Sequence, residues 1–429
     1  MSDMRSRFRL LIPALAVGGL LGALPASAQE AGATYSTWTK VEGAVETREF
    51  KEKLRGGGQF DAAARSFVTR VALPQLGLEA NRPTIERVRR RMREIVLSDI
   101  ADEKAFEDAA KTVLDAMAAL ARNEDAERVV RVNAMLLVGE LRAKDNRPLP
   151  AAAPVLAAAA GDVRLPLEVR IAAAAGLMRH AEAAKAGGDP AAVAKALAPA
   201  LVPMLTGDPK TGPVAAIDWL AGRGLAIMQT LGPQAGSKEA VTAAARILGD
   251  ASRSVDVRVR AAAALGAAAT ADSGVDAARA VESVRGVAIT GLEADFAAAE
   301  RLRMERRVAG AAEEPMIPAL ACRRDAWRLA VCADAIEGAD GGAGLIGLVG
   351  NDAAAAKDLA TVLRQAAAGL DANPDEQSVI DALEKLGKPV AGAAPAANRP
   401  AQPAATQPQD VPAKDESNSP FDAASPFGP

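Results

Sequence analysis

The chain has 429 residues, a formal net charge of −3 and a hydrophobic content of 50%. This content is too high for a disordered protein, and the slightly acidic balance provides no general attraction to nucleic acid or to an anionic membrane. Aromatic residues make up only 3% of the chain, and its apolar residues are mostly Ala, Leu and Val. Because alanine is the best helix former and the β-branched and aromatic runs of strands are scarce, the composition predicts an all-α fold.

The first 28 residues contain the three parts of an export signal in the expected order. Three arginines precede an uncharged apolar stretch at 10–24, and the small residues Ala-Ser-Ala follow at 26–28. We therefore predict cleavage between Ala28 and Gln29 and a mature protein that is periplasmic or secreted in a bacterium. A retained membrane anchor is the alternative, although the stretch is shorter than the roughly 20 residues that a spanning helix requires.

Residues 29–42 are small and polar and are predicted to form a flexible leader. Apolar residues then recur at helical spacing, which predicts a separate N-terminal helical unit at 43–110. Five arginines between 87 and 93 make one of its helices strongly basic. This cluster is interpreted either as a solvated helix face, which is the common case, or as a site that binds a polyanion.

A short pattern then recurs three times, with an acidic residue shortly before an arginine and a run of small apolar residues after it. Its residues are Glu127, Arg131 and Gly139 in the first block, Glu168 and Arg170 in the second, and Asp256, Arg258 and Gly266 in the third. The arginines are 39 and 88 residues apart, and 88 is two steps of 44. Steps of this size are typical of two-helix repeats.

The segments between these blocks fit the partner helices of such pairs. Helices are expected at 151–160, 190–205 and 238–248, each followed by a turn that contains Gly and Asp. Pro190 directly after Asp189 is typical of a helix start, because Asp caps the first turn and proline fits within it. The middle of the chain is therefore predicted to alternate between two kinds of helix.

The three blocks resemble the second helix of HEAT/armadillo-type repeats, most closely at 253–267. The resemblance implies an α-α superhelix, a solenoid of stacked helix pairs with a concave face. It also implies that the acid and the arginine of each block pair with neighbouring repeats. A helix pair of this kind cannot bury its apolar face alone and must stack on its neighbours. We assign the array to 111–386, with a degenerate part at 310–386.

Residues 387–429 are rich in proline and have no apolar period, which predicts a disordered tail. Ser-Pro-Phe occurs twice in it, at 419–421 and at 425–427. This repeated apolar motif is interpreted either as a docking peptide or as part of a tail with no specific role.

The sequence offers no catalytic, cofactor or metal site. His180 is the single histidine, and a structural zinc site requires about four ligands. The position of His180 near a predicted helix end suits a cation. If Cys322 and Cys332 share one helix, they lie about 15 Å apart along its axis and cannot form a disulfide. A disulfide between them requires that 318–322 folds back as a loop.

We therefore expect a non-enzymatic, exported scaffold that presents a concave surface to a protein or polymer partner. No nucleic-acid partner and no membrane span are expected once the signal is removed. One alternative is a structural envelope protein held by an uncleaved signal helix. Another is an enzyme accessory subunit that uses the region 43–110. The sequence does not determine the oligomeric state.

Overall fold

The computed structural model describes residues 41–207, 212–308, 319–339 and 343–387. The chain divides into two units, Met1–Lys388 and Pro389–Pro429, and all described residues belong to the first. The expected export signal, the cleavage site at Ala28 and Gln29, residues 29–40 of the leader and the tail after 387 lie outside the described residues.

The described residues form helices and no strands, which confirms the predicted all-α fold. They contain 15 α-helices. In chain order these are α2 (Val41–Arg55), α3 (Ala62–Phe67), α4 (Ile85–Leu97), α5 (Glu103–Arg122), α6 (Arg128–Glu140), α7 (Ala152–Gly161), α8 (Leu167–Lys185), α9 (Pro190–Thr206), α10 (Val214–Leu231), α11 (Lys238–Gly249), α12 (Val255–Ala268), α13 (Ala277–Val308), α14 (Ala319–Glu337), α15 (Ala353–Ala372) and α16 (Glu376–Lys385).

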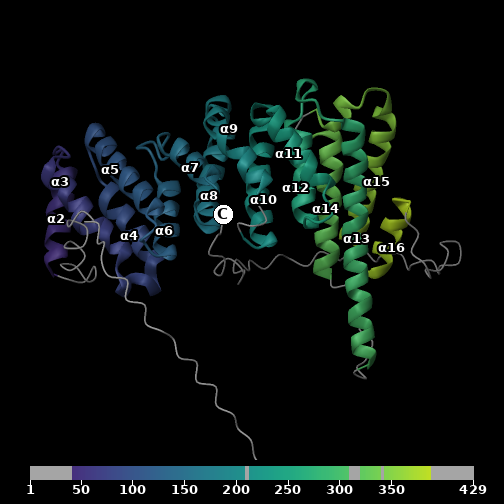
Figure 1. Cartoon of the computed structure of the whole chain (residues 1–429), viewed down its shortest axis with the longest axis horizontal. Coiled ribbons are helices and arrows are strands. Elements are labelled where there is room, and N and C mark those ends of the chain that lie inside the picture. The colour runs from purple at the N-terminus through teal and green to yellow at the C-terminus, as the bar shows by residue number, and fades with distance from the viewer. Residues whose placement is uncertain (1–40, 208–211, 309–318, 340–342, 388–429) are drawn as a thin grey trace, which may run out of the picture. The chain divides into compact units, whose positions relative to one another are not determined.

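From α4 onward most helices lie in two layers (Figure 1). The second layer consists of α4, α6, α8, α10, α12 and α14, each packed on the next. The first layer consists of α7, α9, α11 and α13, which pack on one another and on the second-layer helix that follows each of them. At the C-terminal end α15 packs on α14, and α16 packs on α13 and α15. Helices that are neighbours in the chain are thus neighbours in space.

Small residues allow the second-layer helices to approach closely. A Cβ atom added to Gly139 of α6 would lie 2.8 Å from the Cα atom of Gly176 in α8. A Cβ atom added to Gly266 of α12 would overlap the backbone of Ala335 in α14. The glycines of the recurring pattern are therefore positions of backbone contact between successive second-layer helices.

Tertiary packing also explains a helix that contains two glycines. Gly222 and Gly224 are poor helix formers, yet both lie inside the continuous helix α10. A Cβ atom added to Gly222 would lie 3.4 Å from the Cδ atom of Arg260, and one added to Gly224 would lie 3.3 Å from a methyl group of Leu205. Burial between neighbouring helices outweighs the low helix propensity here.

The N-terminal region differs from the expectation at its C-terminal boundary. The boundary expected at 110 falls inside α5, an alanine-rich helix that the sequence analysis did not single out. This helix begins after Asp102, whose side chain accepts a hydrogen bond from the Ala105 amide. In addition, α3 continues through a π-helical turn at Val68–Ala72 and a 3-10 turn at Leu73–Gly77. The stacked rings of Phe50 and Phe67, 4.5 Å apart, join α2 to α3.

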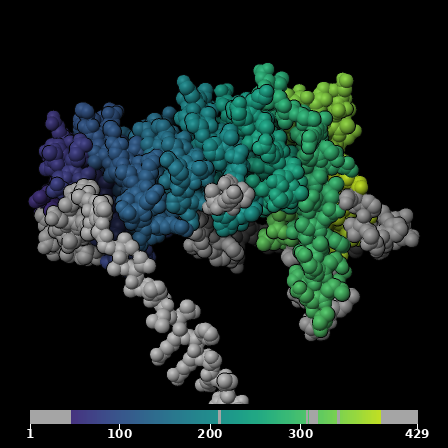
Figure 2. Space-filling view, viewed as in Figure 1, coloured from purple at the N-terminus to yellow at the C-terminus, as the bar shows by residue number. Residues whose placement is uncertain are grey.

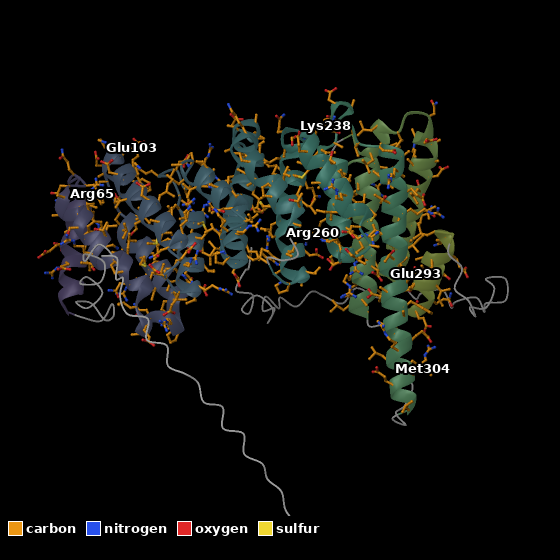
Figure 3. The ribbon with its side chains drawn as sticks, in the orientation of Figure 1. Arg65, Glu103, Lys238, Arg260, Glu293 and Met304 are labelled. Carbon is orange, nitrogen blue, oxygen red and sulfur yellow. The ribbon has the colours of Figure 1, made fainter. Side chains whose placement is uncertain are left out.

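The region after 275 has fewer and longer helices than expected. The apolar spacing around Gly291 predicts two separate helices, at 275–290 and 292–308, but α13 runs through both without a break. The C-terminal half of α13 extends beyond the neighbouring helices (Figures 1 and 2). Met304, labelled in Figure 3, lies on this extension and is 56% exposed. None of the helices in the described ranges is both long and apolar enough to cross a membrane.

Candidate functional site

The arginines of the recurring pattern hold each helix pair together from inside. Arg131, Arg170 and Arg258 are buried. Their Nε atoms donate to the carbonyl oxygens of Ala121, Ala160 and Leu248, ten residues earlier in the chain, at 3.1, 3.0 and 3.0 Å. These carbonyls lie near the ends of the preceding helices, where carbonyl groups lack helical partners and a cation is stabilised by the helix dipole. The three side chains therefore cap helices within their own pair.

The acidic residues of the pattern contact neighbouring helices of the second layer instead. Glu168 accepts a hydrogen bond from Arg128 of α6 at 3.1 Å. Asp256 pairs with Arg328 of α14 at 2.7 Å, and Glu127 pairs with an arginine that precedes α4. The resemblance implied pairing with neighbouring repeats for both the acid and the arginine. The acids do reach neighbours, and Arg170 also donates to the Pro203 carbonyl oxygen of α9, in the next pair, at 3.2 Å. The contacts described for Arg131 and Arg258 stay within their own pairs.

His180 is a buried core residue of α8. Because α8 continues to Lys185, His180 does not lie in the last turn as expected. Burial and the nearby Arg179 lower the pKa of His180 to about 4, so the ring is neutral at neutral pH. Its Nε2 atom has no hydrogen-bond partner among the described residues. The expected favourable cation at a helix end is thus corrected to a neutral, buried imidazole.

Cys322 and Cys332 both lie in α14, buried and free. The loop geometry that a disulfide between them requires is not present, because α14 begins at Ala319. Burial raises the pKa of Cys322 to about 11 and that of Cys332 to about 12. Reactive cysteines require the thiolate, so these thiols behave as apolar core groups.

The basic helix α4 is partly neutralised by the second layer. Arg89 and Arg93 both contact Glu140 of α6, at 3.1 and 3.5 Å. Arg90 pairs with Glu86 of its own helix at 3.5 Å. This pairing reduces the charge that α4 presents to a polyanion.

A different set of arginines lies on successive second-layer helices, and we call Arg179 of α8, Arg223 of α10 and Arg260 of α12 the arginine row. Arg179 and Arg223 are half-buried and Arg260 is exposed. Arg260, labelled in Figure 3, lies against Gly222 of α10. Burial first, and then the charges of Arg260 and Arg179, lower the pKa of Arg223, while the charge of Glu182 opposes them. The three cations are thus close enough to repel one another.

The row is held in place without ion pairs. Arg179 donates to the Gly139 carbonyl oxygen at 3.1 Å. The guanidinium group of Arg223 lies 4.4 Å from the ring centroid of Trp219, and that of Arg260 lies 5.9 Å from the ring centroid of Trp327. Both distances allow cation–π attraction. Within the described part of the chain, no carboxylate lies within 4.0 Å of any cation in the row. The row therefore combines positive charge and aromatic surface without a carboxylate in direct contact, and the charges of Glu140 and Glu182 act on it from further away.

This site is not predictable from the sequence alone. Trp219 and Trp327 lie in helical segments, where a tryptophan is more simply interpreted as a core or repeat-edge residue, and no motif singles out the three arginines. The spacing of Trp219 and Arg223, one helical turn apart, is a local signal of a cation–π pair. The gathering of cations from three helices has no such signal, because it depends on how the helices pack.

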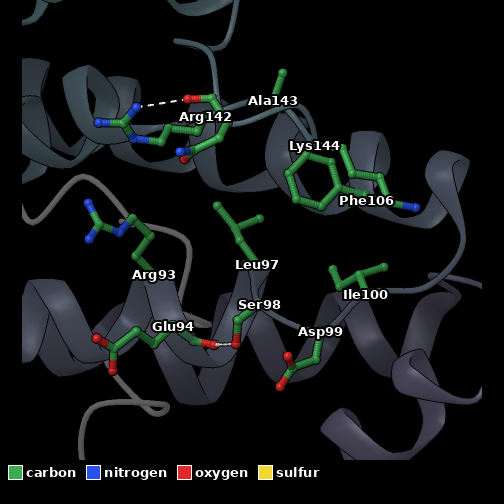
Figure 4. Close-up of a pocket in the computed structure, with 11 residues that line it drawn as sticks. Arg93, Glu94, Leu97, Ser98, Asp99, Ile100, Phe106, Arg142, Ala143 and Lys144 are labelled. Carbon is green, nitrogen blue, oxygen red and sulfur yellow. Dashed lines mark hydrogen bonds between the residues drawn. The ribbon is translucent and has the colours of Figure 1, made fainter.

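A hollow of about 420 Å³ between α4, α5 and the loop after α6 is a second candidate (Figure 4). Leu97, Ile100 and Phe106 form its apolar side, and cationic side chains lie around it. Asp99 and Asn146, which line it, have φ angles of 63° and 66° and are the non-glycine residues with positive φ in the described ranges. Asp and Asn tolerate this conformation better than other residues.

The cationic side chains around this hollow form hydrogen bonds with the surrounding loops. Lys144 Nζ donates to the Ala101 carbonyl oxygen at 2.5 Å, and Arg142 donates to the Asn146 carbonyl oxygen at 2.8 Å. Arg55 donates to the Asp99 carboxylate at 2.9 Å. These polar groups are thus already hydrogen-bonded to one another, and the hollow is better explained as a helix junction than as a binding site.

A cluster of charged residues joins α12, α13 and α14, and we call it the aspartate cluster; it consists of Asp256, Asp295, Asp325, Arg324 and Arg328. Arg328 lies 2.7, 3.3 and 2.8 Å from the carboxylates of Asp256, Asp295 and Asp325, and Arg324 lies 2.6 Å from Asp295. Burial and the charge of Asp295 raise the pKa of Asp325 to about 7. Each arginine has a carboxylate, so the cluster is internally paired and structural.

No group of His, Cys, Asp or Glu within the described ranges is arranged to hold a metal ion. Among the candidate sites in the described ranges, the arginine row is the one whose cations lack a contacting carboxylate. Compared with models of protein families, with curated proteins and with solved structures, the chain gives no match.

Proposed function

We propose that the protein is an exported, non-enzymatic scaffold of HEAT-like repeats that binds a protein partner on its second-layer face. The observation that carries the proposal is the arginine row, in which three cations from successive helices lie together and none has a carboxylate of the described residues within 4.0 Å. Like charges at close range disfavour the folded chain, and an anionic partner on this face removes that penalty.

The packing of the helices supports the repeat assignment. Second-layer helices contact the next second-layer helix, and first-layer helices contact the next first-layer helix. The recurring pattern places an equivalent buried arginine in α6, α8 and α12. In a HEAT-like solenoid one layer lines the concave face. We assign that role to the second layer, because it carries the arginine row.

The test is site-specific photo-crosslinking in cells. A photoreactive residue at Ala226 of α10, one turn beyond Arg223, is expected to capture a partner. The same residue at Thr242, which is exposed on α11 of the first layer, is expected to capture none. Adducts from Thr242 but not from Ala226 would contradict the assignment of the binding face.

Export is tested separately. The mature protein is expected in the periplasmic or culture fraction with an N-terminus at Gln29. A membrane pellet that contains the chain with residues 1–28 attached would support the structural envelope alternative instead. An enzyme accessory role predicts adducts from the region 43–110 rather than from α10.

A further inference from the structure

The aspartate cluster holds more buried negative charge than buried positive charge. The side chains of Asp295 and Asp325 are 14% and 1% exposed, and only one guanidinium group, that of Arg328 at 9%, is buried with them. Asp256 and Arg324 are about half exposed, so water solvates their charges. Burial of an unbalanced charge is costly. The interior of the cluster is therefore neutral only when one of its two buried carboxylates holds a proton.

The hydrogen bonds of Asp325 show where that proton fits. Its Oδ1 atom accepts a hydrogen bond from Nη1 of Arg328 at 2.8 Å, whereas its Oδ2 atom is buried and has no hydrogen-bond partner among the described residues. A protonated Oδ2 becomes a donor. The carboxylate of Asp295 lies beside it as an acceptor, since the same Nη1 atom of Arg328 also contacts Asp295 at 3.3 Å. Two carboxyl groups this close commonly share one proton.

The charges around Asp325 do not remove this imbalance. Arg328 is the one cation within 4.0 Å of Asp325 in the described part of the chain. Arg324 binds both carboxylate oxygens of Asp295, at 2.6 and 2.7 Å. Burial and three nearby carboxylates raise the pKa of Cys322 to about 11, so its thiol is neutral. The charged groups that face Asp325 and Cys322 from the packed elements are Asp256 of α12, Asp295 of α13, Arg324 and Arg328 of α14 and Asp375 before α16, whereas Arg364 of α15 is paired with Asp334 and Glu337 further along α14.

The cluster lies at the base of a projecting helix. We call the part of α13 that follows Asp295 the arm, and it includes the extension visible in Figure 1. Two charged contacts hold the arm near its base, because Asp295 binds two arginines of α14 and Arg303 binds Glu376 of α16 at 3.0 Å. The large apolar side chains that the arm exposes are Leu302, Met304 and Val308. The contact of Asp295 with α14 therefore influences how firmly this apolar surface is held.

We propose that Asp295 and Asp325 share one proton that fixes the base of the arm to α14, and that release of this proton to solvent loosens the arm. With the proton in place, Oδ2 of Asp325 donates to Asp295, and Arg328 balances the remaining negative charge. Without it, two buried carboxylates face each other beside a single buried guanidinium group. The inference goes beyond the proposed function, since it concerns the arm and not the arginine row.

The direction of the pH dependence follows from the two states of Asp325. Burial and the charge of Asp295 raise its pKa to about 7 in the closed state, from an ordinary value of 3.8. When the base of the arm opens, water reaches Asp325 and its pKa falls toward the ordinary value. Opening therefore releases a proton between pH 4 and pH 7. The opening equilibrium is expected to rise by about tenfold per pH unit in this range and to level off above it.

The test is hydrogen–deuterium exchange of the mature full-length protein at pH 5 and pH 7.5, corrected for the intrinsic pH dependence of exchange. Peptides of α13 around Asp295 and of α14 around Asp325 are expected to exchange at least about tenfold faster at pH 7.5. Peptides of α7 are the internal reference, because α7 has no titratable side chain and packs on α6, α8 and α9. Their corrected exchange is expected to be unchanged. Equal corrected rates around the cluster at both pH values, or the same rise in α7, would overturn the proposal.

Protein variants locate the proton. Asp325→Asn keeps the shape of the side chain and supplies a permanent donor to Asp295, so the exchange around the cluster is expected to stay near its pH 5 level at both pH values. Asp334→Asn is the matched control, because Asp334 lies on the same helix in a half-exposed pair with Arg364. It is expected to keep the pH dependence of the wild type. An unchanged pH dependence in Asp325→Asn, or an equal loss in Asp334→Asn, would contradict the assignment.

Two further measurements separate a shared proton from simple burial. Asp295→Asn removes the second carboxylate, so Asp325 is expected to ionise at lower pH and the rise in exchange to move below that of the wild type. A rise at the same pH as in the wild type would overturn the sharing. Infrared spectroscopy at pH 6, where exposed carboxyl groups are ionised, is expected to show the C=O band of a protonated carboxyl group that is absent in Asp325→Asn. Identical spectra for the two proteins would show that Asp325 holds no proton and would overturn the proposal even if the variants were unstable.

Discussion

The arginine row and the aspartate cluster are adjoining groups of charged residues. Both contain arginines, but these are paired with carboxylates only in the cluster. In the cluster, Arg328 contacts three carboxylates and is nearly buried. In the row, Arg260 contacts a tryptophan ring and is exposed. Asp256 and Arg260 lie four residues apart on α12, and an acid and an arginine at this spacing commonly form an ion pair. Instead Asp256 binds Arg328, which leaves Arg260 without a carboxylate.

This difference separates charges that stabilise the fold from charges that are open to a partner. A buried, paired arginine costs stability when it is removed, because its carboxylates remain in the interior. An exposed, unpaired arginine costs little when it is removed, because solvent takes its place. The following predictions test the distinction, in order of decreasing effect.

Replacing Arg328 with Met is expected to have the largest effect on the free energy of unfolding. At pH 8 the buried carboxylate of Asp325 loses its counter-charge, whereas Asp295 keeps Arg324, and the loss of stability is expected to be about 3–5 kcal/mol. Urea unfolding followed by circular dichroism measures it. Arg260→Met is the control and is expected to cost less than about 1 kcal/mol. Similar losses for both variants would remove the distinction between the two regions.

The aspartate cluster is expected to make the fold less stable as the pH rises. The folded pKa of Asp325 is raised to about 7 from an ordinary value of 3.8. Between these values the folded chain binds a proton that the unfolded chain has lost, so stability falls as the pH rises from about 4 to about 7 and is constant above. Asp325→Asn is expected to reduce this slope. Urea unfolding at several pH values measures it, and an unchanged slope would contradict the prediction.

His180, next to the arginine row, is expected to act in the opposite direction. Its folded pKa is lowered to about 4 from 6.5, so between these values the unfolded chain binds the extra proton. The contribution of His180 to stability is therefore present above pH 6.5 and is lost as the pH falls toward 4. His180→Leu is expected to protect the fold at pH 4.5 relative to pH 7. The same loss of stability at pH 4.5 in the variant and in the wild type would argue against this role.

Removing one cation from the row is expected to have the smallest effect on stability. Arg223→Gln relieves repulsion from Arg179 and Arg260 but also removes the contact with Trp219 and the attraction of Glu182, so a net change of about 0.5 kcal/mol or less is expected. The repulsive part of this change should shrink with added salt, because salt screens charges. Thermal unfolding at low and high salt measures it, with Arg246→Gln as a control. A clear loss of stability would show that Arg223 serves the fold rather than a partner.

Much of the helical architecture was predictable from local pattern. The helices expected at 151–160, 190–205 and 238–248 are α7, α9 and α11, because each combines apolar spacing with turn residues at its end. The single helix α13 was not predictable in this way. Glycine is a poor helix former, so Gly291 predicts a break, but a Cβ atom added to it would lie 3.3 Å from a methyl group of Val255 in α12. Contact with a neighbouring helix decided the conformation.

By itself, the sequence determined that the described chain is helical and that equivalent arginines recur in a step near 40 residues. These features depend on propensity and on spacing along the chain, which are local properties. Only the tertiary structure decided which charges remain unpaired. Ion pairs depend on which helices lie side by side. Because α12 packs on α14, Asp256 pairs with Arg328 rather than with Arg260. Arg260 is left without a contacting carboxylate because Asp256 pairs with Arg328.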